Sequence, residues 1–512
     1  MWNYYFCFVL LIVFILLLSC EIVKDIKEHM SSYYIIPYCL ILTLLFKYNY
    51  GFEFWGLEYE DAYSFSFCAR QFSHGIYPNS FLIDAVGIGS LEEPSLIYTY
   101  GGHFITYSTF LSIFTQIFGW STLVIDIVNT SLAFCVLLVL SLLGNKNRCW
   151  FIAPAIYCSA PIINVFANCF LSEIFSSFIL ISFVYLFIKK KNSIVCLLAF
   201  SIALLCKREN LILLFVPFIS SLFDYYLGRK QLIIDIFKKN LPYLIVIAIY
   251  LMCIQNIFEI ESIESGDIGT YTFSYKYFEI LFPIFVKSLF SIYSFSIVVC
   301  IYISYVFFYI LKYKQIKNEI WISIILVLGY TILYSSHYRG YFFINGEEVT
   351  RFETYRYINN YFVFIPLAFT LFSMKIRKYI IISIVILLSF SFIYTIDARI
   401  YFSKLEYESR FKEVEIVAEY IDNKDKPAIL ICENILLYQN KCSSNFKVCS
   451  ITVFDFLDVN NKEYDYFCVL SDMEYLKERY GVKINMNDLK PVLLLPDGKY
   501  LYQYLNSYDI KH

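Results

Sequence analysis

Apolar segments follow one another along most of this chain and decide what it can fold into. A helix needs about 20 mostly apolar residues to cross a bilayer, and about twelve runs between Tyr4 and Tyr394 reach or approach that length. Only 16% of the residues are charged, which is low for a soluble protein. The sequence therefore predicts a polytopic α-helical membrane protein. The candidate spans are Tyr4–Leu18, Tyr34–Phe46, Thr122–Leu143, Trp150–Phe166, Cys169–Ile188, Val195–Leu205, Leu211–Leu227, Leu241–Ile257, Leu289–Leu311, Ile320–Tyr334, Tyr361–Phe372 and Tyr379–Tyr394.

Basic residues cluster between these runs and predict how the helices cross the membrane. Loops rich in Lys and Arg remain preferentially on the cytoplasmic side. With every basic cluster on that side, the loops 47–103, 259–267 and 337–356 and the chain after Ala398 are extracytoplasmic. Residues 104–118 are then expected to form an interfacial helix rather than a span. The basic clusters are Lys24 with Lys27, Lys146 with Arg148, Lys189–Lys191, Arg229–Lys230 with Lys238–Lys239, Lys312–Lys317 and Lys375–Lys378.

The chain after Ala398 is different in kind, because charged residues become frequent there. Helix-like stretches separate three runs typical of strands, Ala428–Cys432, Tyr466–Leu470 and Val492–Leu495. This pattern predicts a small extracytoplasmic α/β domain at the C-terminus. We therefore divide the chain into N-terminal transmembrane helices (1–50), a first extracytoplasmic loop with interfacial helices (51–121), a transmembrane helix bundle (122–397) and the α/β domain (398–512).

Neither a metal nor a nucleic acid is indicated as a partner. The 16 cysteines form no C-x-x-C pair, and the sequence has no H-E-x-x-H motif. The formal net charge of −2 gives no reason to expect nucleic acid binding. No cofactor motif is present, although a requirement for a divalent cation remains open.

A group of acids stands soon after the second apolar run. Glu58, Glu60 and Asp61 lie within four consecutive positions and, with the orientation above, face away from the cytoplasm. One interpretation is an ordinary solvated loop. At a membrane cavity, however, a carboxylate can act as a general base toward an acceptor hydroxyl group. These acids are therefore candidates for catalysis.

The sequence around the acids resembles a known loop. Glu60-Asp61-Ala62-Tyr63, followed by Gly75-Ile76-Tyr77-Pro78, is similar to the first extracytoplasmic loop of GT-C-type glycosyltransferases. The relevant branch contains the protein O-mannosyltransferases and the lipid A aminoarabinose transferases. His103 lies where this family often has Lys or His, although Gly102 and Phe104 replace its usual Glu and Pro. The resemblance implies a GT-C-like membrane fold.

The resemblance also implies an activity, which is sugar transfer from a polyprenyl-phosphate donor to a glycan, lipid or protein acceptor. Asp61 or Glu60 would be the base that activates the acceptor, so that a single displacement inverts the anomeric carbon. The implied location is the bacterial inner (cytoplasmic) membrane, with the active site on the extracytoplasmic face. The cations expected to bind the donor phosphate are Lys207, Arg208, His103, Arg351 and Arg356.

Other interpretations of the same residues stay open. Lys207 and Arg208 stand between two short apolar runs, where such a pair can also extend toward the interface simply to reach water. An O-antigen or polysaccharide polymerase would depend on Arg351 and Arg356 rather than on the acids. A transporter of lipid-linked sugars is a third possibility, but many transporters contain internal repeats and this sequence shows none.

Overall fold

A computed structural model of the chain describes residues 2–28, 32–50, 69, 106–119, 121–144, 150–167, 171–226, 233–254, 275–294, 296–313, 317–336, 349–372, 377–404, 407–432, 438, 446–450, 463–469, 486–496 and 498–505. Its internal contacts divide it into two compact units. One comprises Trp2–Gly56 and Phe104–Ile400, and the other contains Tyr401–His512. Each unit is described separately.

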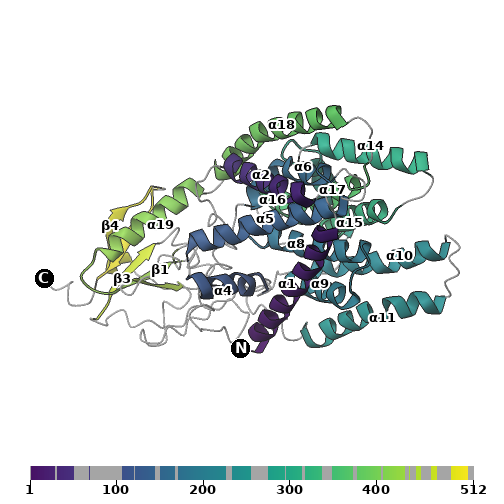
Figure 1. Ribbon diagram of the computed structural model, residues 1–512. Helices are drawn as coiled ribbons and strands as arrows, with labels where there is room; N and C mark the ends of the chain where they lie inside the picture. The colour runs from purple at the N-terminus through teal and green to yellow at the C-terminus, as the bar shows by residue number, and fades with distance from the viewer. Residues whose placement is uncertain are drawn as a thin grey trace. The chain divides into compact units, whose positions relative to one another are not determined.

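The first unit is helical (Figure 1). Its described elements are α1 (Trp2–Glu28), α2 (Ser32–Tyr50), α4 (Thr106–Phe118), α5 (Thr122–Gly144), α6 (Ile152–Cys158), α7 (Pro161–Ala167), α8 (Glu173–Ile188), α9 (Ser193–Cys206), the 3₁₀ helix η2 (Arg208–Leu214), α10 (Phe215–Tyr226), α11 (Ile233–Ile249), the π-helix η3 (Tyr250–Ile254), α13 (Tyr275–Leu289), α14 (Ser296–Tyr313), α15 (Asn318–Ser336), α16 (Val349–Phe362), α17 (Phe364–Phe369) and α18 (Arg377–Lys404).

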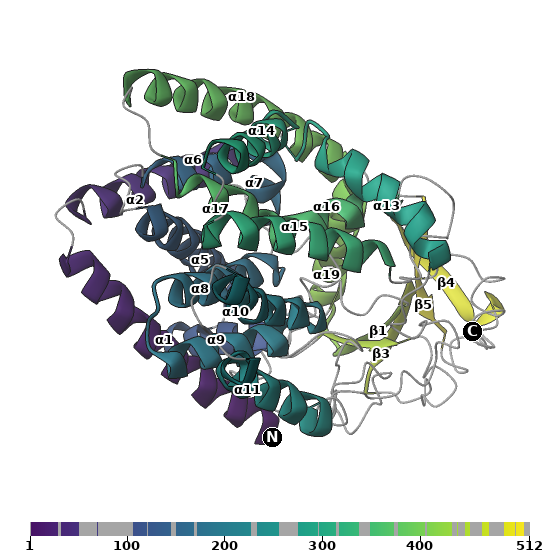
Figure 2. The same cartoon turned by 90° about the vertical axis from the view of Figure 1, so that its right-hand side faces the viewer.

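Helix α8 lies at the centre of this unit. Its residues from Glu173 to Leu186 are all buried, and all but Glu173 and three serines are apolar or aromatic. A helix that is apolar on every side needs neighbours on every side, and α8 packs against α5, α9 and α16 (Figure 2). The residue that begins α8 is therefore held deep in the unit.

Three of the described helices are long and apolar enough to cross a membrane. They are Tyr5–Glu28, Leu123–Gly144 and Asn318–Ser336. Helix α4 has 13 residues, fewer than a bilayer crossing needs, in line with the expectation that residues 104–118 are not a span. The prediction of about twelve transmembrane helices stays a prediction, because several other apolar helices of the described chain are shorter than a full crossing.

Two expected spans are broken instead of continuous. The run Trp150–Phe166 forms the short helices α6 and α7, because Pro161 begins α7 and the residue before a proline is disfavoured in helical conformation. The backbone N–H of Ile162 donates to the carbonyl oxygen of Tyr293 at 3.0 Å instead. The run Tyr361–Phe372 is likewise divided between the end of α16 and α17. The prediction of one continuous helix was wrong in both places.

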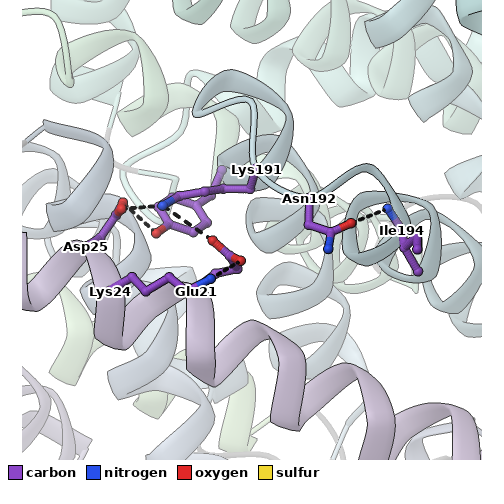
Figure 3. A network of polar contacts seen from close by, with 7 residues as sticks. Glu21, Lys24, Asp25, Lys191, Asn192 and Ile194 are labelled. Carbon is purple, nitrogen blue, oxygen red and sulfur yellow. Dashed lines mark hydrogen bonds and ion pairs between the residues drawn. The ribbon is translucent and has the colours of Figure 1, made fainter.

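Charged residues join the end of α1 to the turn after α8 (Figure 3). The Lys191 ammonium bonds to Asp25 and lies 3.5 Å from the Glu21 carboxylate, and the Tyr185 hydroxyl donates to Asp25 at 2.7 Å. Burial is the largest single effect and lowers the pKa of Lys191, but the hydrogen bonds and charge attraction of Asp25 and Glu21 together outweigh it, so the pKa is raised. Lys24, which bonds to Glu21, thus lies at the same end of the bundle as Lys191, as the basic clusters predict.

We expect Asp25→Leu to lower the free energy of unfolding by about 3 kcal/mol, because Lys189 and Lys191 would lose a buried carboxylate partner. Thermal unfolding in detergent measures the change. Lys24→Ala is the control, since the Lys24 side chain is 62% exposed and its ion pair should contribute less than about 1 kcal/mol. Equal effects of the two variants would contradict a stabilising role for this network.

The second unit contains α19 (Tyr407–Asp422) and a five-stranded sheet in the order β2-β1-β3-β5-β4. Strand β1 pairs in parallel with β2 and β3, and β5 pairs antiparallel with β3 and β4. The three strand-like runs of the sequence fall on β1, β3 and β4. The strands are β1 (Ala428–Cys432), β2 (Phe446–Ser450), β3 (Asp465–Val469), β4 (Leu489–Leu494) and β5 (Tyr500–Tyr504), with the 3₁₀ helix η6 (Met486–Asp488) before β4.

Helix α19 covers one part of this sheet through aromatic contacts. The rings of Tyr420 and Phe467 meet edge to face at 6.1 Å. All of β1 is buried, as expected of a central strand with parallel neighbours. Between β4 and β5 the chain turns at Gly498, whose φ of +87° is a conformation that favours glycine. The side of the membrane on which this unit lies stays a prediction.

Candidate functional site

A buried carboxylate joins two of the cations predicted from the sequence. Oε1 of Glu173, at the start of α8, lies 3.1 Å from Nζ of Lys207 and 2.8 Å from Nε of Arg356. The Glu173 side chain is fully buried, and those of Lys207 and Arg356 are 14% and 10% exposed. Charges this far from water are costly unless they are paired. The three side chains, which we call the Glu173 cluster, therefore stabilise one another.

Lys207 reaches Glu173 because the chain leaves the helical conformation at this residue. Helix α9 ends at Cys206, and Lys207 is extended, with φ −155° and ψ 136°. The side chain of Asn210 donates to the carbonyl oxygen of Ala203 at 2.7 Å. The backbone N–H of Asn210 donates to the carbonyl oxygen of Lys207 at 3.1 Å. Asn210 thus bonds to a carbonyl group on each side of the break and ties the end of α9 to the start of η2.

Arg356 comes from a helix instead of the predicted loop. The interpretation of residues 337–356 as one cationic loop was wrong at its end, because α16 begins at Val349. Helix α16 is polar for a buried helix, and its side chains bond to its neighbours: Asn360 donates to the Tyr334 hydroxyl at 2.9 Å. Packing against α8 and α15 then brings Arg356 to Glu173.

Aromatic rings lie beside the Glu173 cluster in a continuous column. Tyr357, next to Arg356, stacks on Tyr334 with ring centroids 4.8 Å apart. Tyr334 stacks in turn on Tyr330 and Tyr361, at 5.9 Å and 6.1 Å. Tyr330, Tyr334 and Tyr361 are at most 1% exposed, whereas Tyr357 is partly exposed. The column gives α15 and α16 a rigid common surface.

Helix α4 packs against the first turn of α8. Phe175, two residues after Glu173, contacts the rings of Tyr107 and Phe110 at 5.7 Å and 4.7 Å. The hydroxyl of Tyr107 also donates to the side-chain oxygen of Asn129 at 2.8 Å. Helix α4, the next described helix after Glu60 and Asp61 in the sequence, is thus held near the Glu173 cluster.

The remaining predicted site residues are described only in part. Glu60, Asp61 and His103 lie outside the described residues. Arg208 begins η2 and Arg351 lies in the first turn of α16, but the positions of their side chains are not described. The assignment of catalytic and phosphate-binding roles to these five residues therefore stays a prediction.

Glu173 is the residue that the sequence reasoning missed. It stands inside the apolar run Cys169–Ile188 as its single charged residue before Lys189. An ionisable residue within a membrane segment is by default a functional candidate, so the signal was present. Its two partners lie 34 and 183 residues away in the sequence, so the pairing could not be predicted from the sequence alone.

The charge of the cluster suits an anionic ligand. Two cations and one carboxylate give a net charge of +1, and a charge surrounded by low-dielectric protein acts more strongly than it would in water. Arg and Lys are the usual protein ligands of phosphate groups. In the part of the chain that the structure describes, no group of three or more His, Cys, Asp or Glu side chains could hold a metal ion.

Comparison with known proteins finds similar structures but no similar sequences. No protein-family model and no curated protein matches the sequence. Among solved structures, that of ArnT from Cupriavidus metallidurans bound to undecaprenyl phosphate matches 93% of this chain and 99% of its own, with a TM-score of 0.54 and 11% identity. The chain has the fold of this ArnT structure. The apo structure of ArnT matches over the same shares with a TM-score of 0.50 and 10% identity. The predicted likeness to the lipid A aminoarabinose transferases is thereby confirmed for the fold.

Proposed function

We propose that the protein is a membrane glycosyltransferase that transfers a sugar from a polyprenyl-phosphate donor to an extracytoplasmic acceptor. The observation that carries this proposal is the meeting of Lys207 and Arg356 at Glu173, inside a fold shared with an ArnT structure that holds undecaprenyl phosphate. Two cations that the sequence assigned to a lipid phosphate, from separate segments of the chain, are thus neighbours in space. The acceptor is a glycan, a lipid or a protein.

The chemistry assigns each group a role. The acceptor oxygen forms a bond to the anomeric carbon while the bond from that carbon to the phosphate oxygen breaks, which inverts the carbon. Asp61, with Glu60 beside it, takes the proton of the acceptor hydroxyl group. The electron pair of the broken bond stays on the lipid phosphate, and Lys207 and Arg356 stabilise its charge.

Glu173 keeps these two cations in place before the donor arrives. Without it, two positive side chains would lie close together and repel each other in a mostly buried site. Arg208, Arg351 and His103 are further cations that we assign to the same phosphate. The membrane is proposed to be the bacterial inner membrane, with the site and the C-terminal unit on its extracytoplasmic face.

Incubation of the purified protein with a panel of polyprenyl-phosphate sugars and candidate acceptors tests this proposal. We expect release of free polyprenyl phosphate together with a glycosylated acceptor, both of which mass spectrometry detects. The variant Lys207→Gln should lower the rate by about 10²-fold or more, because it removes a charge that stabilises the leaving group. Phe308→Leu, on an exposed face of α14, is the matched control. Movement of the donor across a vesicle without phosphate release would indicate a transporter instead.

A further inference from the structure

We infer that helix α15 positions the two phosphate-binding cations, through the hydroxyl groups of Tyr330 and Tyr334. This inference rests on the proposed function in one respect only, which is the role of Lys207 and Arg356 toward a lipid phosphate. The two cations belong to segments 149 positions apart, and Glu173 alone does not fix the backbones that carry them. Helix α15 contacts both η2 and α16, and Figure 2 shows α15 beside α16.

The first link runs from Tyr330 to the segment that carries Lys207. The Tyr330 hydroxyl donates to the side-chain oxygen of Asn210 at 2.7 Å. Asn210 uses its other groups to hold the carbonyl oxygens of Ala203 and Lys207. Both residues are fully buried, so a lost bond could not be replaced by bulk water. The hydroxyl of Tyr330 therefore fixes the orientation of the residue that shapes the break at Lys207.

The residue before Tyr330 allows η2 to approach so closely. A Cβ atom on Gly329 would lie 2.3 Å from Cδ1 of Ile212, so a larger residue at this position would force the end of the Ile212 side chain to move. Gly329 thus lets η2 pack closely against α15. Asn210 and Ile212 are both held against consecutive residues of α15.

The second link runs from Tyr334 to the helix that carries Arg356. The Tyr334 hydroxyl accepts a bond from the side chain of Asn360 at 2.9 Å. Asn360 lies four residues after Arg356 and thus on the same face of α16. The stack of Tyr334 on Tyr357 supports the same helix from the neighbouring position.

The two links lie one turn apart on α15, because Tyr330 and Tyr334 are four residues apart. Four residues of an α-helix rise by about 6 Å. Their rings stack at 5.9 Å, so neither can move without the other. One rigid helix thus defines the separation of Lys207 and Arg356 and leaves Glu173 to pair with both. Tyr330 and Tyr334 are positioning residues and need not touch the substrate.

A double-mutant cycle tests the positioning role. We expect Tyr330→Phe to weaken binding of undecaprenyl phosphate in detergent by about tenfold, since it leaves the oxygen of Asn210 buried without its donor. In a Lys207→Gln background the same change should have little further effect. Tyr334→Phe should likewise weaken binding by itself and have little further effect in an Arg356→Gln background. If the two tyrosines had a purely structural role, the losses of binding free energy in the single variants would add in the double variant.

The matched control is Tyr302→Phe in α14, which removes another buried hydroxyl, bonded to Ser323 at 2.9 Å. It should lower thermal stability without weakening undecaprenyl phosphate binding. Equal loss of binding in Tyr302→Phe and Tyr330→Phe, or full additivity with Lys207→Gln, would overturn the inference.

Hydrogen exchange of the unliganded protein separates this inference from the proposed function. Tyr330→Phe should speed exchange of the amides of η2, Tyr334→Phe those of α16, and Tyr302→Phe neither. Unchanged exchange in both regions would refute the positioning role even if the protein binds the lipid. Faster exchange in a protein that does not bind undecaprenyl phosphate would support the positioning role and refute the proposed function.

Discussion

Glu173→Gln is expected to destabilise the protein strongly. The amide keeps the shape of the side chain but removes the charge that Lys207 and Arg356 share, and both cations remain mostly buried. Loss of one partner from a buried ion pair costs about 3–5 kcal/mol. Thermal unfolding in detergent measures the change. Glu279→Gln on α13, where the side chain is exposed, is the control and should change little.

A second variant separates the stability of the cluster from its function. Glu173→Leu combined with Lys207→Met and Arg356→Met replaces all three charges with apolar groups. Such replacements often preserve or even raise stability, because no charge remains to be desolvated. We expect this variant to fold but not to bind undecaprenyl phosphate. Binding with wild-type affinity would show that the Glu173 cluster serves only the fold.

The sequence predicted the class of fold because composition and hydropathy are properties of single residues and their neighbours. The apolar runs located most of the described helices, and the strand-like runs located β1, β3 and β4. The predictions were wrong where two local features of the sequence favour different structures. Pro161 divides a run that is apolar enough to span, and the polar residues of α16 form a helix that hydropathy assigned to a loop.

Of the residues that form the candidate site, only the cations could be predicted from the sequence. Lys207 and Arg356 stand out because charge is rare in and beside apolar runs. The role of Glu173 depends on Lys207, between α9 and η2, and on Arg356 of α16, and packing between helices brings both residues to it. Tyr330 and Tyr334 gave no signal, since tyrosine occurs 48 times in this chain and their role depends on Asn210 and Asn360. Pairings of this kind are a property of the tertiary structure.

The acid pair of the first loop should be the largest single determinant of turnover. We expect Asp61→Asn to lower the rate of sugar transfer by about 10²- to 10⁴-fold, because the amide cannot accept the proton of the acceptor hydroxyl group. Glu60→Gln is the companion variant, and the larger loss identifies the base. Neither change should weaken binding of undecaprenyl phosphate, because the acids act on the acceptor and the cations on the lipid phosphate. Transfer is followed by the release of polyprenyl phosphate.

Glu58→Gln is the matched control for these variants. Glu58 belongs to the same cluster of acids but lies outside the stretch that resembles the GT-C loop, so its loss should leave transfer unchanged. Wild-type transfer by both Asp61→Asn and Glu60→Gln would refute the assignment of the base. If transfer instead disappears in Arg351→Gln and Arg356→Gln while the acid variants remain active, a polysaccharide polymerase becomes the better assignment. The acids thus decide between the two enzymes, because the proposed glycosyltransferase needs both the acids and Arg356, whereas a polymerase would depend on the arginines alone.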